Sequence, residues 1–207
     1  MFASSAIIEE VYFMRSVGLA TLAYFYCDFK ENQKKSLHGL LSWLLYQLCR
    51  QSDTYCNVGF EFYSEHAESG DNAVNTPNDD ALVACLKNLL KLPGAPVYLI
   101  VDALDECPNT STVPSPRAKV LKFLEDLIRS QVPNLHICVT SRLEADIKDV
   151  LDPLIPRQIS LHDERGQKRD IEDYIRLAID GHPKSGLWKA EDKRLVIDVL
   201  TEKADGR

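Results

Sequence analysis

The sequence has no excess of basic residues, no apolar run of membrane-spanning length and no secretion signal. Its 31 Asp and Glu outnumber its 24 Lys and Arg, and the net charge of −7 argues against non-specific binding to nucleic acid or to an anionic membrane. The longest apolar run, Val17 to Cys27, has 11 residues, about half of what a membrane-spanning helix needs. No basic segment precedes the short apolar run at the N-terminus, which makes it a poor signal peptide. We predict a cytoplasmic protein with no nucleic-acid or membrane partner.

Motifs for metal binding and nucleophilic catalysis are also missing. The six cysteines lie at irregular spacings, mostly within apolar stretches, and form no C-x-x-C pair. The five histidines are isolated, with no Ser or Cys placed for a triad and no cysteine at ligand spacing. We interpret the cysteines as reduced thiols in the core of a cytosolic protein, and the alternatives are a zinc site or a disulfide framework.

Helical and extended patterns alternate along the chain. After a predicted cap at Ser36, six leucines recur at helical spacing and form one stripe: Leu37, Leu40, Leu41, Leu44, Leu45 and Leu48. Other helices are predicted at 2–15, 58–66, from Thr76-Pro77 onward, and at 117–130, 168–180 and 188–203. Strands are predicted at 19–26, 97–101, 135–140 and 157–161. Strands joined by helical crossovers indicate an α/β protein whose parallel sheet has helices on both faces.

Acidic residues follow one of these strands directly, in the stretch VYLIVDALDEC from Val97 to Cys107. A buried carboxylate is costly unless it is paired or bound to a metal. In a parallel sheet the ligand crevice lies at the carboxyl ends of the strands, where Asp102 can hold Mg²⁺. Asp105 and Glu106 can then position a water beside a phosphate and accept its proton. The alternative is that these three acids only solvate a loop and cap a turn.

A second strand, in the stretch HICVTSR, ends in Thr140, Ser141 and Arg142. An arginine at a strand end is by itself typical of a surface salt bridge. Its planar, permanently charged fork also suits a phosphate oxygen. Because the acidic strand end is expected at the same edge of the sheet, Arg142 is a candidate phosphate sensor.

In combination, the stretches AYFYCDF, LLSWLLYQL, VYLIVDALDECPN and PNLHICVTSR resemble the NACHT nucleotide-binding domain of fungal NLR-type proteins, the region also described as the nephrocystin-like N-terminal NTPase domain. The similarity runs from about Ser4 to the C-terminus. It implies a three-layer P-loop NTPase sandwich with strand order 5-1-4-3-2. It also implies an oligomerising STAND-type switch that uses Mg²⁺ with ATP or GTP and pairs with NLR-like relatives.

The same resemblance implies roles for individual residues. Asp102 matches the Walker B aspartate that holds Mg²⁺, and Asp105 and Glu106 match the acidic pair that supports hydrolysis. Arg142 matches the sensor arginine that reads the terminal phosphate, with Thr140 and Ser141 beside it in the nucleotide-binding segment.

The family's phosphate loop, G-x-x-x-x-G-K-[ST], has no counterpart, because the chain contains no Gly-Lys dipeptide. By the resemblance, Met1 falls just after this loop, and the strand before the loop is missing too. Losing about four charge-assisted hydrogen bonds of roughly 1.5–3 kcal/mol each costs at least about 6 kcal/mol, on the order of four decades in Kd. We expect that the chain by itself binds neither nucleotide nor Mg²⁺ tightly.

These considerations predict a truncated NTPase core over residues 1–161 and the start of a helical segment over residues 162–207. The strands at 19–26, 97–101 and 135–140 should stay adjacent as 2-3-4. The fifth strand, 157–161, should be displaced or pair with strand 4, because unpaired strand edges promote aggregation. A second hypothesis is a non-enzymatic module that pairs with full-length relatives through its open sheet edges or its leucine-rich helix.

Overall fold

The computed structural model describes residues 2–67, 76–159, 165–182 and 188–204. Its contacts divide the chain into two compact units, Met1–Ile155 and Pro156–Arg207. The first unit contains a parallel sheet of three strands in the order β1-β2-β3, with β1 at Thr21–Tyr26, β2 at Val97–Asp102 and β3 at Leu135–Val139. The α/β class and the adjacency of these three predicted strands are confirmed.

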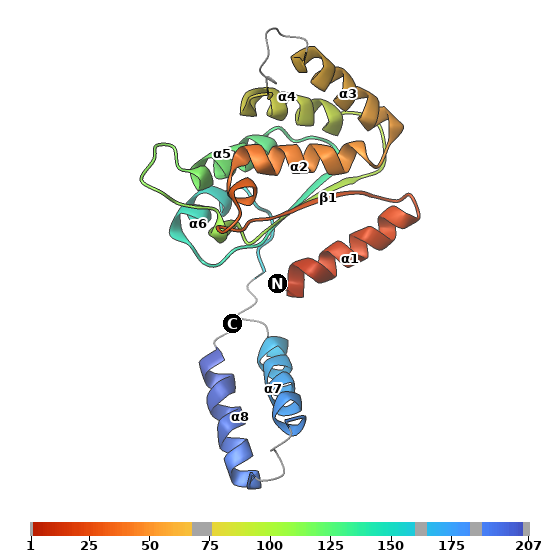
Figure 1. Ribbon diagram of the computed structural model, residues 1–207. Coiled ribbons are helices and arrows are strands. Elements are labelled where there is room, and N and C mark those ends of the chain that lie inside the picture. Colours follow the sequence, from red (N-terminus) through yellow and green to blue (C-terminus); the bar gives the residue numbers. More distant parts are fainter. Residues whose placement is uncertain (1, 68–75, 160–164, 183–187, 205–207) are drawn as a thin grey trace. The chain divides into compact units, whose positions relative to one another are not determined.

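The helices of the first unit cover both faces of this sheet (Figure 1). They are α1 (Phe2–Ser16), α2 (Leu37–Cys49), α3 (Asp53–Ala67), α4 (Asp79–Leu90), α5 (Pro116–Arg129) and α6 (Ala145–Leu151), with short 3-10 turns η1 (Asn32–Lys35) and η2 (Leu104–Glu106). Successive side chains of a strand point to opposite faces. Ala23 and Leu99 therefore belong to the large core cluster that includes α2, α4 and α5, whereas Leu22 and Ile100 pack with Val11 of α1.

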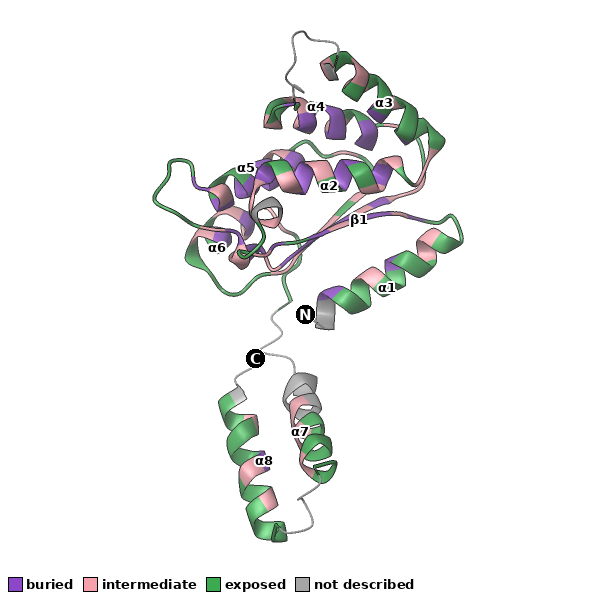
Figure 2. Cartoon of the chain, in the orientation of Figure 1, coloured by how far each residue is buried: buried purple, intermediate pink, exposed green. Residues whose placement is uncertain are grey.

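The leucine stripe of α2 is the centre of the larger core. The Ser36 side chain caps the helix by accepting a hydrogen bond from the Gly39 N–H at 3.2 Å. All six leucines of the stripe are buried. Buried residues gather along α2, α4, α5 and the strands, whereas α3 is mostly exposed (Figure 2). The stripe is thus a packing surface, as helical periodicity predicts, and is not available to a partner.

Two glutamines, Gln47 of α2 and Gln51 in the turn that follows it, cover the outer edge of β1. Gln51 accepts a hydrogen bond from the Leu22 N–H at 3.0 Å and donates to the Leu22 carbonyl at 2.6 Å. Gln47 does the same for Tyr24, at 3.3 Å and 2.7 Å. Each amide therefore replaces the pair of backbone bonds that a neighbouring strand would supply.

Two sequence predictions of local structure are wrong. Residues 157–159 have no strand geometry, and residues 160 and 161 lie outside the described residues. A strand needs a neighbour for its backbone groups, and in the described sheet β3 pairs with β2 alone. The helix expected from Thr76-Pro77 begins only at Asp79, because the Asn78 side chain caps it by accepting from the Ala81 N–H at 2.9 Å.

The second unit is a helical hairpin. Helices α7 (Arg165–Asp180) and α8 (Ala190–Ala204) contact each other along their lengths (Figure 1). Lys193 Nζ lies 3.0 Å from Asp180 Oδ1 and forms an ion pair between the two helices. Both helices lie close to the ranges that the sequence predicts. Across the described residues, no helix combines the length and apolar character that a bilayer crossing requires.

Candidate functional site at the strand ends

The strand register brings the predicted site residues to one end of the sheet. Tyr26 lies beside Asp102, and Val101 lies beside Val139, so the segments that follow β2 and β3 leave the sheet together. We call the six predicted residues the strand-end cluster: Asp102, Asp105, Glu106, Thr140, Ser141 and Arg142. Two side-chain pairs form within it, Asp102 with Thr140 and Asp105 with Arg142.

Asp102 is the last residue of β2 and is only 5% exposed. The Thr140 hydroxyl donates a hydrogen bond to Asp102 Oδ1 and accepts one from the Ala103 N–H at 3.0 Å. The chain turns away from the sheet at Ala103, whose φ of 54° lies in the left-handed region. In the described part of the chain, Asp102 Oδ2 has no hydrogen-bond partner, so this buried carboxylate has one oxygen left for a ligand.

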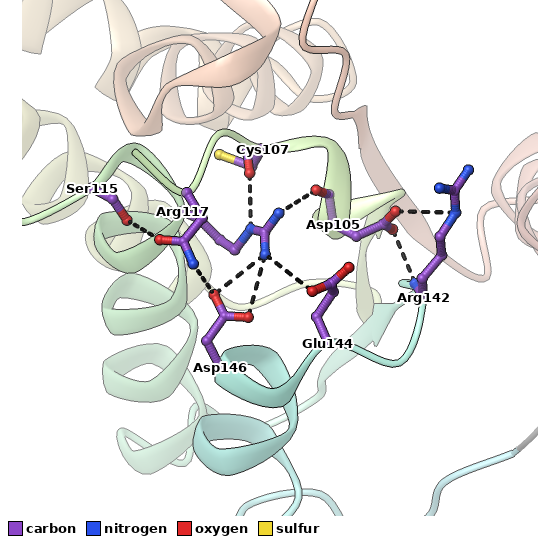
Figure 3. Close-up of polar contacts among 8 residues, drawn as sticks. Asp105, Cys107, Ser115, Arg117, Arg142, Glu144 and Asp146 are labelled. Atoms are coloured by element: carbon purple, nitrogen blue, oxygen red, sulfur yellow. Dashed lines mark hydrogen bonds and ion pairs between the residues drawn. The ribbon is translucent and has the colours of Figure 1, made fainter. Parts of the chain in front are cut away.

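Asp105 binds Arg142 through both of its carboxylate oxygens (Figure 3). Oδ1 accepts a hydrogen bond from the Arg142 backbone N–H at 3.0 Å, and Oδ2 lies 3.5 Å from Arg142 Nε. The Asp105 side chain is 9% exposed, whereas that of Arg142 is 83% exposed. The carboxylate thus holds the backbone N–H and Nε of Arg142, whereas the terminal nitrogens of the guanidinium remain open to solvent.

Glu106 and Ser141 make no such contacts. Glu106 ends the 3-10 turn η2 and is half-buried, while Ser141 is exposed. Over the described ranges, neither side chain has a hydrogen-bond or ion-pair partner. Of the two acids that follow Asp102, Glu106 is therefore the one whose carboxylate is free to accept a proton from a bound water.

The N-terminal end of α1 also lies at this end of the sheet. Tyr26, the last residue of β1, shares a side-chain hydrogen bond with Ser5. Partial burial and the neighbouring Asp102 raise the pKa of the Tyr26 phenol, and the bond to Ser5 opposes that shift. The N-terminus of a helix carries partial positive charge, which favours an anion at this end of the sheet.

Arg117, a buried arginine beside the cluster, is not among the residues that the sequence predicts for the site. Its side chain lies in the first turn of α5 and binds the carbonyl oxygens of Asp105 and Cys107 and the carboxylate of Asp146 (Figure 3). A signal was present in the sequence. Arg117 precedes Val120, Leu121 and Leu124 at spacings of three, four and seven residues, which places a charge on the buried face of the helix.

The cysteines correct one expectation from the sequence. Cys27, Cys85 and Cys107 are buried, as expected for core thiols, but Cys56 is exposed and the core interpretation is wrong for it. Cys107 Sγ donates to the Lys35 carbonyl at 3.3 Å. In the residues that the structure describes, no three His, Cys, Asp or Glu side chains are grouped to hold a metal ion.

The Cys27 thiol, next to the strand-end cluster, should make stability fall at high pH. Burial first, then Cys107 and Asp102, raise the pKa of Cys27 from 9.0 to about 12. A group whose pKa is raised by folding stabilises the folded state fully below its unfolded pKa, and this contribution is lost as the pH rises through the folded pKa.

Between the unfolded pKa of 9.0 and the folded value of about 12, we expect Cys27 to contribute a loss of about 1.4 kcal/mol in unfolding free energy per pH unit. Urea unfolding of the wild type and of Cys27→Ala, at pH values below and above 9.0, measures this loss. The free energy of unfolding should fall more steeply with pH in the wild type than in Cys27→Ala. Equal slopes in the two proteins would contradict the prediction.

Comparison with known proteins identifies the family of the chain. A family model described as "Nephrocystin 3, N-terminal" matches residues 2–142, which is more than half of the chain and includes the whole strand-end cluster. Searches of the curated proteins and of the solved structures found no match. The chain belongs to the nephrocystin 3 N-terminal family.

Proposed function

We propose that the chain carries the Mg²⁺-binding and phosphate-sensing half of a NACHT-type P-loop NTPase domain, in a signalling switch that oligomerises. One observation carries this proposal: the partly free carboxylate of Asp102 and the exposed guanidinium of Arg142 lie at, or just after, the ends of two adjacent strands. Each is held by a side chain of the other strand end, Thr140 and Asp105 respectively. A cation ligand and an anion ligand fixed at one sheet end suit a metal–phosphate complex.

The contacts suggest a division of roles within the cluster. Asp102 would hold Mg²⁺ of ATP or GTP through the oxygen that Thr140 does not use. Arg142 would contact the terminal phosphate, with the exposed Ser141 hydroxyl beside it. Glu106, which has no side-chain partner among the described residues, would accept the proton of the attacking water. Asp105 would support hydrolysis indirectly by holding Arg142.

The chain by itself should bind nucleotide only weakly. Residues 1–207 contain no Gly-Lys dipeptide, so the loop that surrounds the phosphates in P-loop proteins has no counterpart. Starting from a micromolar site, the loss of about four phosphate contacts predicts a Kd on the order of 10 mM. We expect no shift of the melting temperature with Mg²⁺·ATP or Mg²⁺·GTP at about a tenth of that concentration.

A titration followed by two-dimensional NMR tests the proposal in this weak range. With Mg²⁺·ATP near the expected Kd of about 10 mM, amide shifts should be confined to residues 102–106 and 140–142. ATP should cause larger shifts than ADP, because only ATP presents the terminal phosphate to Arg142. The variant Arg142→Gln should lose this difference.

Arg129→Gln is the matched control, because Arg129 is an exposed arginine of α5 paired with Glu125 at 3.0 Å. It should keep the preference for ATP over ADP. Shifts that are absent, that lie elsewhere in the chain, or that persist unchanged in Arg142→Gln would overturn the proposal. A melting shift that Asp102→Ala abolishes would instead show that the chain binds nucleotide tightly without a Gly-Lys loop.

The unpaired edge of β3 supports a second candidate function, a non-enzymatic module that pairs with NLR-like relatives. The outer edge of β1 is closed by Gln47 and Gln51, whereas in the described sheet nothing pairs with the outer edge of β3. Such a module would form a heteromer with a full-length relative in the absence of nucleotide. Recovery of the chain alone when the two are expressed together would contradict it.

A further inference from the structure

Arg117 is a buried arginine whose three side-chain nitrogens all have partners. Its side chain is 9% exposed. Nε donates to the Cys107 carbonyl at 2.8 Å and Nη2 donates to the Asp105 carbonyl. Nη1 lies 3.3 Å from each carboxylate oxygen of Asp146 and 4.0 Å from Glu144 Oε2. These contacts radiate from one guanidinium in Figure 3.

The two carbonyl contacts shape the acidic turn after β2. Asp105 and Cys107 are the residues on either side of Glu106, and the same guanidinium binds both of their carbonyl oxygens. The backbone that carries the free Glu106 carboxylate is therefore held at two points, one on each side of Glu106. A planar fork can make these contacts together with an ion pair, whereas a lysine ammonium is a single point of charge.

The carboxylate contacts hold the segment after β3. This segment, residues 142–146, is fastened near its start by Asp105, which binds Arg142, and at its end by Arg117, which binds Asp146. Asn109 reinforces the second attachment by donating from Nδ2 to Asp146 Oδ2 at 3.0 Å. Arg117 is thus the common partner of the turn with Glu106 and of the segment with Arg142.

We propose that Arg117 is a positioning residue that holds the Glu106 turn and the Arg142 segment in a fixed relation to each other. The roles of Glu106 and Arg142 rest on the proposed function, but the coupling of the two segments rests on the contacts alone. Removing the guanidinium frees the carbonyls of Asp105 and Cys107. It also releases Asp146, so that both segments gain mobility without loss of the core.

Amide hydrogen exchange of the complete chain tests this coupling. In Arg117→Met and Arg117→Lys, the amides of Cys107 and Arg142 should exchange about tenfold faster, because the turn and its attachment to Arg142 loosen. The amides of Leu22 and Tyr24, bonded to Gln51 and Gln47, should exchange at the wild-type rate. Arg129→Lys, at an exposed position of the same helix, should leave all four amides unchanged.

Two results would overturn the proposal. Equal acceleration at Leu22 and Tyr24 would show that Arg117 only stabilises the fold, and full protection in Arg117→Lys would show that charge suffices without the fork. If Arg117→Met does not fold, Asp146→Asn replaces it. The Asp146 side chain is 36% exposed, and the neutral amide of asparagine weakens only the attachment of the segment after β3 to Arg117. In Asp146→Asn the Arg142 amide should exchange faster, and an unchanged rate would count against the coupling.

The exchange measurement needs no nucleotide, so its outcome is independent of the nucleotide titration. Faster exchange at Cys107 and Arg142 together with no preference for ATP would leave the coupling intact and remove the proposed function. A clear preference for ATP together with unchanged exchange in the Arg117 variants would support the proposed function and overturn the coupling.

Discussion

Replacing both Gln47 and Gln51 with leucine is expected to lower the free energy of unfolding by about 3–4 kcal/mol, at about 1 kcal/mol for each of the four hydrogen bonds lost at the edge of β1. The two amides bind the N–H and carbonyl groups of Leu22 and Tyr24 on the outer edge of β1. Leucine can fill the space but offers no donor or acceptor. The edge groups would then be left unpaired beneath the helix or open to another strand.

Urea unfolding followed by circular dichroism measures the loss, and light scattering after gel filtration reports whether the open edge promotes association. The control is Gln158→Leu, because Gln158 is exposed and has no hydrogen-bond partner in the described residues. It should change the unfolding free energy by less than about 0.5 kcal/mol. A double variant as stable and monomeric as the wild type would show that the glutamines do not protect the edge.

The second large effect is expected for Thr140→Val, which should lower the free energy of unfolding by about 2 kcal/mol. Valine keeps the shape of threonine but lacks the hydroxyl that donates to Asp102 and accepts from the Ala103 N–H. Asp102 is 5% exposed, and a carboxylate buried to that extent is costly without a partner. The substitution thus leaves a charge and a backbone donor unpaired at once.

Thr140→Ser is the matched control, since serine keeps the hydroxyl and loses only a methyl group. It should retain most of the stability that Thr140→Val loses. The Asp102→Asn background supplies a second check, because the valine substitution should cost less once the charge is gone. Equal destabilisation by valine and serine would mean that the methyl group, and not the hydroxyl, accounts for the contribution of Thr140.

The elements of the sheet could be predicted from the sequence because they depend on local patterns. The apolar runs that form β1, β2 and β3, and the spacing of the leucines in α2, each identify an element and its buried face. Helical crossovers made the sheet parallel, and parallel strands bring the residues after them to one end. The sites of Asp102 and Arg142 follow from these rules without any knowledge of their contacts.

The predicted strand at 157–161 shows where local patterns stop being sufficient. Its composition suits a strand, but residues 157–159 are not one, because strand formation depends on a neighbour whose backbone groups are free and in register. The start of α4 is a smaller case. Both Thr76 and Asn78 are residue types that cap helices, and only the folded chain shows that Asn78 is the cap.

By itself the sequence determined the class of the fold, the helix faces and the end of the sheet where the charged residues gather. The tertiary structure alone decided which groups meet: Thr140 with Asp102, Asp105 with Arg142, Arg117 with the turn around Glu106, and the glutamines in and after α2 with the edge of β1. The physical reason is separation along the chain. Periodicity relates residues within one element, whereas these pairs join different elements, and their partners are set only when the elements pack.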